Sequence, residues 1–128
     1  MSWKRPGSIA EVAAWSSNLD EVSTNLQDFL HEFAARGTLG MLQDRPRNLA
    51  GLFEGGDVCD AYLAATAATL AIQQGHARPP WTDDGDRYLP KPWFASPGSA
   101  MRACLLLESP ARFRERNLFV TANALFVA

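Results

Sequence analysis

The sequence contains few of the residues that build metal centres and reactive thiol sites. Its 128 residues include only two cysteines and two histidines. Zinc sites use ligands in close pairs, but Cys59 and Cys104 lie 45 positions apart, and neither has another cysteine or a histidine within four residues. We therefore expect no metal and no cofactor, and we expect both cysteines to behave as small buried hydrophobes.

Long apolar runs and a secretion signal are missing as well. No stretch of about 18 apolar residues could cross a membrane, and the first residues, MSWKRPGS, lack the apolar core of a signal peptide. Hydrophobic residues make up 47% of the chain and charged residues 20%, which excludes wholesale disorder. A length of 128 residues suits one domain. We expect a single helical domain over residues 1–128 that resides in the cytoplasm and has no contact with a membrane.

The common catalytic motifs are also absent. The sequence has neither the Gly-x-Ser-x-Gly of a nucleophile elbow nor the glycine-rich loop with Gly-Lys-Ser/Thr that binds phosphates. His31-Glu32 begins the motif of a zinc protease, but position 35 is alanine where the motif needs its second histidine. We therefore favour a protein that is not an enzyme. The enzymatic alternative is a small hydrolase or transferase that acts through Asp57, Asp60 or Cys104.

The basic excess typical of a DNA-binding domain is missing, because the formal net charge is −2. The charges are nevertheless unevenly distributed along the chain. Residues 1–86 carry six basic and twelve acidic side chains, whereas residues 87–128 carry six basic and two acidic ones, so the two parts have charges of −6 and +4. This division suits an anionic partner, a second copy packed head to tail, or self-complementation within one fold. We favour self-complementation.

The first third of the chain has the pattern of an amphipathic helix. Ser8 and Glu11 form a capping box, and Arg36-Gly37 is a typical carboxyl end. The apolar side chains between them follow steps of three and four residues: Val12, Trp15, Leu19, Val22, Leu26, Phe29 and Phe33. This pattern predicts either one helix over residues 9–36 or two helices that break at residues 16–20, with Ser17 or Asp20 as the second cap.

The remaining elements are predicted from caps and breakers. Residues 38–56 read as a connector with one or two short helical turns. Asp57 is predicted to cap a helix that ends at residues 73–75, with Asp60 in its first turn, and most of that helix is apolar or small. Further helices are expected at residues 100–108 and 110–116, the second capped by Ser109-Pro110 and stopped at Asn117. Residues 118–120 and 125–127 are apolar and could form short strands, but two pieces of three residues cannot make a sheet alone, so we favour packing of this tail against the bundle. The fold class is therefore all-α: a bundle of about four to five helices with a proline-rich surface loop at residues 76–97.

The candidate site residues are interaction residues. Large aromatics in the proline-rich loop either pin that loop to the core or form an exposed anchor for a partner, and adjacent prolines favour pinning. Arginines near the carboxyl end either bind phosphates or a carboxylate-lined partner, or neutralise the acidic first part of the chain. The candidates for partner binding are Trp81, Trp93, Phe94, Arg102, Arg112, Arg114 and Arg116.

Several segments resemble a group of small bacterial α-helical proteins. The matching segments are FLHEF at residues 29–33, DAYLAA at 60–65, PWT at 80–82, PWFA at 92–95 and ESPARFRERNLFV at 108–120. The tail differs, since the group ends in Ser-Arg-Ala where this chain has Phe126-Val127-Ala128. Such proteins are often encoded beside a nucleotidyltransferase-like protein, so the resemblance implies an antitoxin-type or regulatory pairing. It implies no catalytic residue.

Three functions follow from these patterns. The leading hypothesis is a non-catalytic protein-binding protein, of antitoxin type, that neutralises a nucleotidyltransferase-like product of the adjacent gene through its basic carboxyl-terminal third and its loop aromatics. The alternative is a nucleic-acid-binding regulator that uses the arginines of residues 102–116. The third is the small enzyme described above. A homodimer is compatible with each of them.

Overall fold

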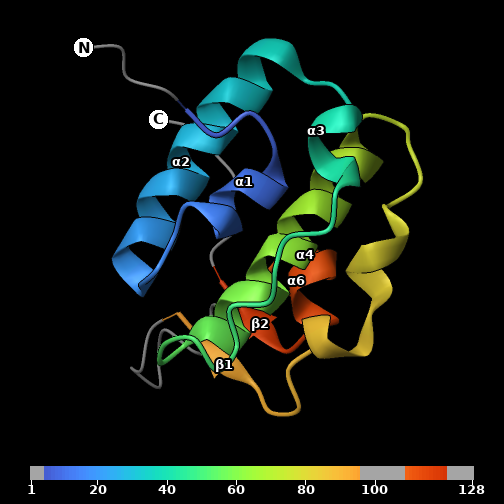
Figure 1. The fold of residues 1–128 in the computed structure, drawn as a ribbon. Helices are drawn as coiled ribbons and strands as arrows, with labels where there is room; N and C mark the ends of the chain where they lie inside the picture. The colour runs from blue at the N-terminus through green and yellow to red at the C-terminus, as the bar shows by residue number, and fades with distance from the viewer. Residues whose placement is uncertain (1–4, 96–108, 121–128) are drawn as a thin grey trace.

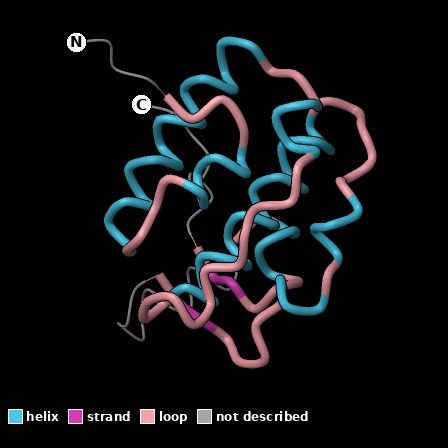
Figure 2. The backbone as a smooth tube through the Cα atoms, viewed as in Figure 1, coloured by secondary structure: helices cyan, strands magenta, loops and turns pink. Residues whose placement is uncertain are grey.

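The computed structural model describes residues 5–95 and 109–120, and the chain is mainly α-helical there (Figure 1). These two segments contain five α-helices, two short 3₁₀ helices and one pair of short strands (Figure 2). In chain order the elements are α1 (Ile9–Ala14), α2 (Leu19–Arg36), α3 (Gly40–Gln43), α4 (Gly56–Gln73), η1 (Pro80–Asp83), η2 (Gly85–Arg87), β1 (Trp93–Phe94), α6 (Ala111–Arg114) and β2 (Leu118–Phe119). The helix predicted at residues 100–108 lies outside the described residues.

The amphipathic stretch at the amino end forms two helices rather than one. Ser8 caps α1 as predicted, because its hydroxyl accepts a hydrogen bond from the backbone N–H three residues on, at 3.3 Å. The second cap is Asn18, whose side-chain oxygen accepts from the N–H of Glu21 at 2.9 Å, so the prediction of Ser17 or Asp20 was wrong. Any of these side chains can cap a helix, and the backbone conformation selects the residue.

Helix α4 is the central element and packs against α2, η1, η2, α6 and β2. Buried residues surround most of its cylinder, as its composition predicted. They belong to two hydrophobic clusters, one shared with α1, α2 and α3 and the other with α6 and β2. Because α4 has apolar neighbours on several sides, it needs no polar face toward water.

The start of α4 differs from the prediction. Gly55 is the residue before the helix and has a φ of 86°, so Asp57 lies in the first turn and is not the cap. Gly56 faces the passing backbone of the connector, and a Cβ at Gly56 would lie 2.0 Å from the carbonyl oxygen of Leu49. Close backbone contact, rather than side-chain capping, therefore defines this helix end.

A two-stranded parallel sheet joins two distant parts of the chain. Trp93 pairs with Leu118 and Phe94 with Phe119, and the N–H of Trp93 donates to the carbonyl of Asn117 at 2.7 Å. For residues 118–120 we favoured packing against the bundle over short strands. The structure shows both, since Leu118 and Val120 are buried and residues 118–119 pair with β1. Residues 125–127 lie outside the described residues. Strands of two residues are too short to produce an alternating pattern in the sequence.

Candidate binding site

Trp81 is part of the hydrophobic core. Its side chain is only 6% exposed, and its indole N–H donates to the carbonyl of Leu42 at 2.9 Å. The guanidinium of Arg87 lies over its ring, 5.2 Å from the ring centre. Trp81 therefore pins the proline-rich loop to the core, the alternative that the adjacent prolines favoured, and it has little exposed surface to offer a partner. The described part of that loop, residues 76–95, does not lie wholly on the surface, because Thr82 and Leu89 are buried as well as Trp81.

Arg116 is also buried. Its guanidinium lies over the ring of Tyr88 at 4.6 Å and donates to the carbonyls of Thr82 at 2.6 Å and Arg112 at 2.9 Å. The prediction of a solvent-facing Arg116 assumed that the short helix continues to residue 116. Helix α6 ends at Arg114, and the turn that follows directs Arg116 into the protein.

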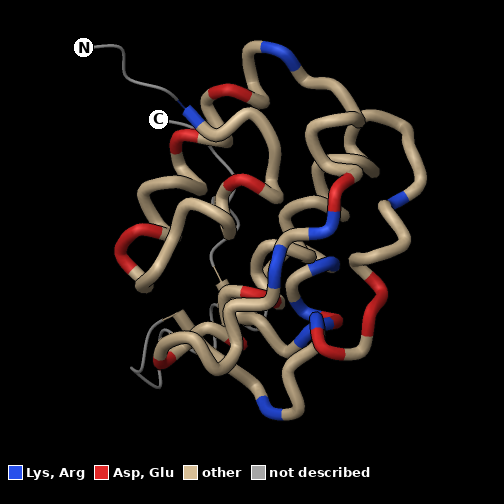
Figure 3. Tube along the Cα trace, viewed as in Figure 1, with Lys and Arg blue, Asp and Glu red and all other residues tan. Residues whose placement is uncertain are grey.

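Arg112 and Arg114, the other described arginines of residues 109–120, differ in their surroundings. Arg112 is partly exposed and lies 3.6 Å from the carboxylate of Glu115, whereas Arg114 is exposed. Arg102 lies outside the described residues. Glu115 also accepts from Arg78 of the acidic first part at 2.6 Å. Two ion pairs of the described residues join residues 1–86 to residues 87–128, namely Arg78 with Glu115 at 2.6 Å and Arg87 with Asp60 at 3.5 Å. Basic and acidic positions lie close together around η2 and α6 (Figure 3).

A buried ion pair holds the connector against α4. The Asp60 carboxylate lies 3.5 Å from the Arg87 guanidinium, and neither side chain is exposed. The same carboxylate accepts from the backbone N–H groups of Leu49 at 2.7 Å and Ala50 at 3.0 Å, and from the side-chain amide of Asn48 at 3.3 Å. Burial lowers the pKa of Arg87, and the Asp60 carboxylate opposes that shift. Asp60 is thus a structural residue that fixes the connector.

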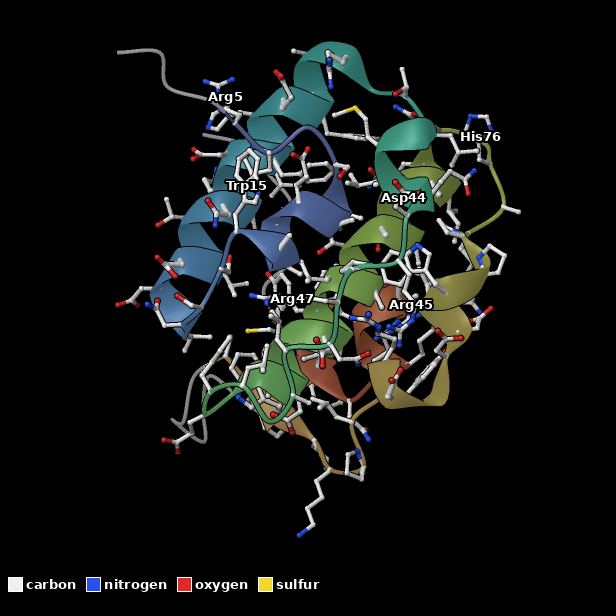
Figure 4. All side chains as sticks on the ribbon, in the orientation of Figure 1. Arg5, Trp15, Asp44, Arg45, Arg47 and His76 are labelled. Atoms are coloured by element: carbon white, nitrogen blue, oxygen red, sulfur yellow. The ribbon has the colours of Figure 1, made fainter. Side chains whose placement is uncertain are left out.

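The connector also reaches α1 and the acidic turn that follows η1. Arg47 donates to the carbonyls of Ala13 at 3.0 Å and Ser16 at 2.7 Å, which completes the carboxyl end of α1. Arg45 forms ion pairs with Asp84 at 2.9 Å and with Asp86 at 3.0 Å, and the hydrogen bond to Asp84 raises its pKa (Figure 4). These polar groups link elements of the fold. Among the described residues, no group of three or more histidine, cysteine or acidic side chains is placed to hold a metal ion.

An apolar groove of about 410 Å³ lies between α2 and α4, and residues in and beside the two strands complete its wall. Leu19 at the start of α2 is 54% exposed and Trp93 in β1 is 37% exposed, although both are large hydrophobic residues. The described residues that line the groove are Leu19, Val22, Ser23, Leu26, Gln27, Leu30, Val58, Cys59, Tyr62, Leu63, Trp93, Ala95 and Val120. The structure thus brings the predicted Trp93 to a groove that the sequence analysis did not identify.

Phe94 supports this groove without lining it. Its ring stacks on Phe119 with 4.9 Å between ring centres and is half-buried. The stacking holds β1 against β2 beside Trp93. Of the predicted loop aromatics, Trp93 is the one with an exposed face at the groove, Phe94 fixes its strand, and Trp81 lies in the core.

The lining of the groove suits binding better than catalysis. Burial raises the pKa of the Cys59 thiol to about 11, so this sulfur stays protonated at neutral pH and is a poor nucleophile. Burial also raises the pKa of Tyr62, whose ring meets Phe113 edge-on with 5.0 Å between centres. Ser23 and Gln27 add polar groups at the α2 wall. Apolar side chains of a bound segment would therefore be shielded from water in this groove.

The comparisons with known proteins found no match to this chain. No family model matches the chain, and no curated protein or solved structure matches it. Within residues 5–95 and 109–120, no helix combines the length and the apolar character that a membrane crossing requires.

Proposed function

We propose that this protein is a non-catalytic protein-binding protein that holds an apolar segment of a partner in the groove between α2 and α4. The observation that carries the proposal is the exposure of Leu19 and Trp93 at this apolar groove. Large hydrophobic side chains that stay accessible beside a groove are typical anchors for a partner, and tryptophan is enriched among residues that dominate binding energy.

The proposed partner is a nucleotidyltransferase-like protein encoded beside this one, which would make the protein an antitoxin-type inhibitor that acts by direct binding in the cytoplasm. The resemblance of residues 57–120 to small bacterial α-helical proteins that are often encoded beside a nucleotidyltransferase-like protein supports this choice. The proposed contact differs from the one expected from sequence, because Trp81 and Arg116 are buried and Arg112 is paired with Glu115. For the same reason the described arginines do not favour the nucleic-acid alternative, which needs several free cations on one surface.

The test is co-purification with the product of the adjacent gene. Trp93→Ala should weaken the complex by roughly thirtyfold, because loss of a central aromatic anchor costs about 2 kcal/mol. Trp15→Ala is the matched control, since Trp15 is 39% exposed but does not line the groove. The proposal fails if the neighbour does not bind, or if both variants bind it as tightly as the unchanged protein.

A further inference from the structure

Helices α1 and α2 form one unit of the fold. They pack against each other, and in Figure 1 the pair lies on one side of α4, whereas α6 lies on the other side. The turn between the two helices is tied from within, because the buried Ser16 hydroxyl donates to the carbonyl of Val12 at 2.6 Å and accepts from the side-chain amide of Asn25 at 2.9 Å. The end of α1 is therefore fixed to α2.

A single side chain, Arg47, makes the described polar contacts between this helix pair and the rest of the fold. Its guanidinium donates to the carbonyls of Ala13 at 3.0 Å and Ser16 at 2.7 Å. Within the described part of the chain, no other hydrogen bond or ion pair joins residues 9–36 to residues 38–95 or 109–120. The pair also contacts α3 and α4 through apolar side chains of one hydrophobic cluster. Apolar contacts have no preferred direction, so Arg47 fixes the position of the pair.

The pair is joined to α3 by a short turn at the far end of α2. Helix α2 ends at Arg36, Gly37 has a φ of 52°, and α3 begins at Gly40. A few loop residues of this kind can serve as a hinge. Helix α2 is about 27 Å long, so a rotation of about 5° at residues 37–39 would move its first residue, Leu19, by about 2 Å. Arg47 holds the chain just before Leu19, where such a movement is largest.

The groove lies at the end that would open. Leu19 and Val22 of α2 and Val58 and Cys59 of α4 line it, all near the start of their helices. Leu19 at the rim is exposed, whereas Cys59 is only 4% exposed and Val22 only 5%. The groove is therefore accessible at its rim and closed at its floor. Movement of α2 away from α4 would uncover the floor.

We infer that α1 and α2 move as one unit about residues 37–39, and that Arg47 is the latch whose contacts with Ala13 and Ser16 set the width of the groove. This inference rests on the proposed function for the use of the groove and adds how access to it is controlled. Opening breaks two charged hydrogen bonds and uncovers apolar side chains, so the closed arrangement is the major state and the open one a minor state.

Alkylation of Cys59 in the full chain with Cys104→Ser measures this opening, because a buried thiol reacts only when the structure around it opens. Arg47→Met removes both hydrogen bonds and should raise the alkylation rate at pH 8 about tenfold, as expected for the loss of a charged hydrogen bond. Arg47→Lys keeps the charge but lacks the fork that reaches both carbonyls, so its rate should lie between those of Arg47→Met and the unchanged chain.

Arg45→Met is the matched control. Arg45 lies two positions away on the same connector, but it pairs with Asp84 and Asp86 rather than with α1 (Figure 4). The control therefore removes the same charge without touching the helix pair, and it should leave the alkylation rate unchanged. Equal acceleration by Arg45→Met and Arg47→Met would overturn the inference.

The urea dependence of alkylation separates opening of the groove from unfolding of the whole protein. Local opening uncovers little surface, so the alkylation rate of Arg47→Met should rise only slightly at low urea. Hydrogen exchange of this variant should be faster in α1 and α2 and unchanged in α6. A rate that follows global unfolding, with faster exchange in every helix, contradicts the latch.

These measurements need no partner. Failure of the latch therefore leaves the co-purification test with Trp93→Ala unaffected, and failure of co-purification leaves the alkylation result unaffected.

Discussion

Replacement of Asp60 by asparagine tests whether the buried ion pair determines how the connector is held. Asp60→Asn keeps the size of the side chain but removes its charge, so the Arg87 guanidinium remains buried without its carboxylate. One of the two carboxylate oxygens becomes an amide NH₂ group, which must then face the N–H of Leu49 or the donors of Ala50 and Asn48. Both changes leave buried polar groups without a suitable partner.

The expected loss of stability is large compared with the total free energy of unfolding. Removal of one partner from a buried ion pair costs about 3–5 kcal/mol, whereas domains are stable by about 5–15 kcal/mol. With a urea dependence of about 2 kcal/mol per molar, the unfolding midpoint should fall by roughly 2 M. Asp57→Asn is the control three positions earlier in the same helix. Because the Asp57 carboxylate is exposed in the first turn of α4, this substitution should lower the free energy of unfolding by less than about 1 kcal/mol.

The assay is urea unfolding followed by far-ultraviolet circular dichroism. A second variant, Arg87→Met, and the double variant complete a thermodynamic cycle, because the double variant removes both charges. We expect the double variant to be less destabilised than the sum of the two single variants. The reasoning would be refuted if Asp60→Asn and Asp57→Asn shifted the midpoint equally, or if the two single effects were additive.

Two further predictions concern α4. Gly56→Ala should destabilise the protein by about 3 kcal/mol or more in the same urea assay, because the new Cβ would overlap the Leu49 carbonyl. Gly85→Ala is the control and should have little effect, because its Cβ would meet nothing within 4 Å. The pKa of Cys59 is raised to about 11 from an ordinary 9.0, so in a Cys104→Ser background the thiol of the folded protein should be alkylated far more slowly at pH 8 than the thiol of the urea-unfolded chain. The free energy of unfolding should also fall as pH rises from 9 to 11, because the unfolded chain releases this proton first. Equal alkylation rates in the folded and unfolded states would contradict this account of its burial.

Elements with local signals were predictable from the amino-acid sequence. The cap at Ser8, the apolar stripe of α2, its end at Gly37 with a φ of 52°, and the apolar character of α4 all depend on residues within a few turns of one another. Hydrogen bonds at helix ends and the period of apolar residues act over that range, so a single sequence predicts them.

The roles of the charged and aromatic side chains depend on contacts between distant segments. Asp60 was interpreted as a carboxylate at a helix start, but its partners are the distant Arg87 and the connector backbone. Arg116 has no local signal that separates a buried position from an exposed one, since its partner Tyr88 lies 28 residues away. Adjacent prolines favoured a pinned Trp81, but its hydrogen-bond acceptor Leu42 lies 39 residues away and is identified only by the structure. The groove likewise requires α2, α4 and the strands to meet. Burial depends on which distant segments pack together, and composition and periodicity do not specify that packing.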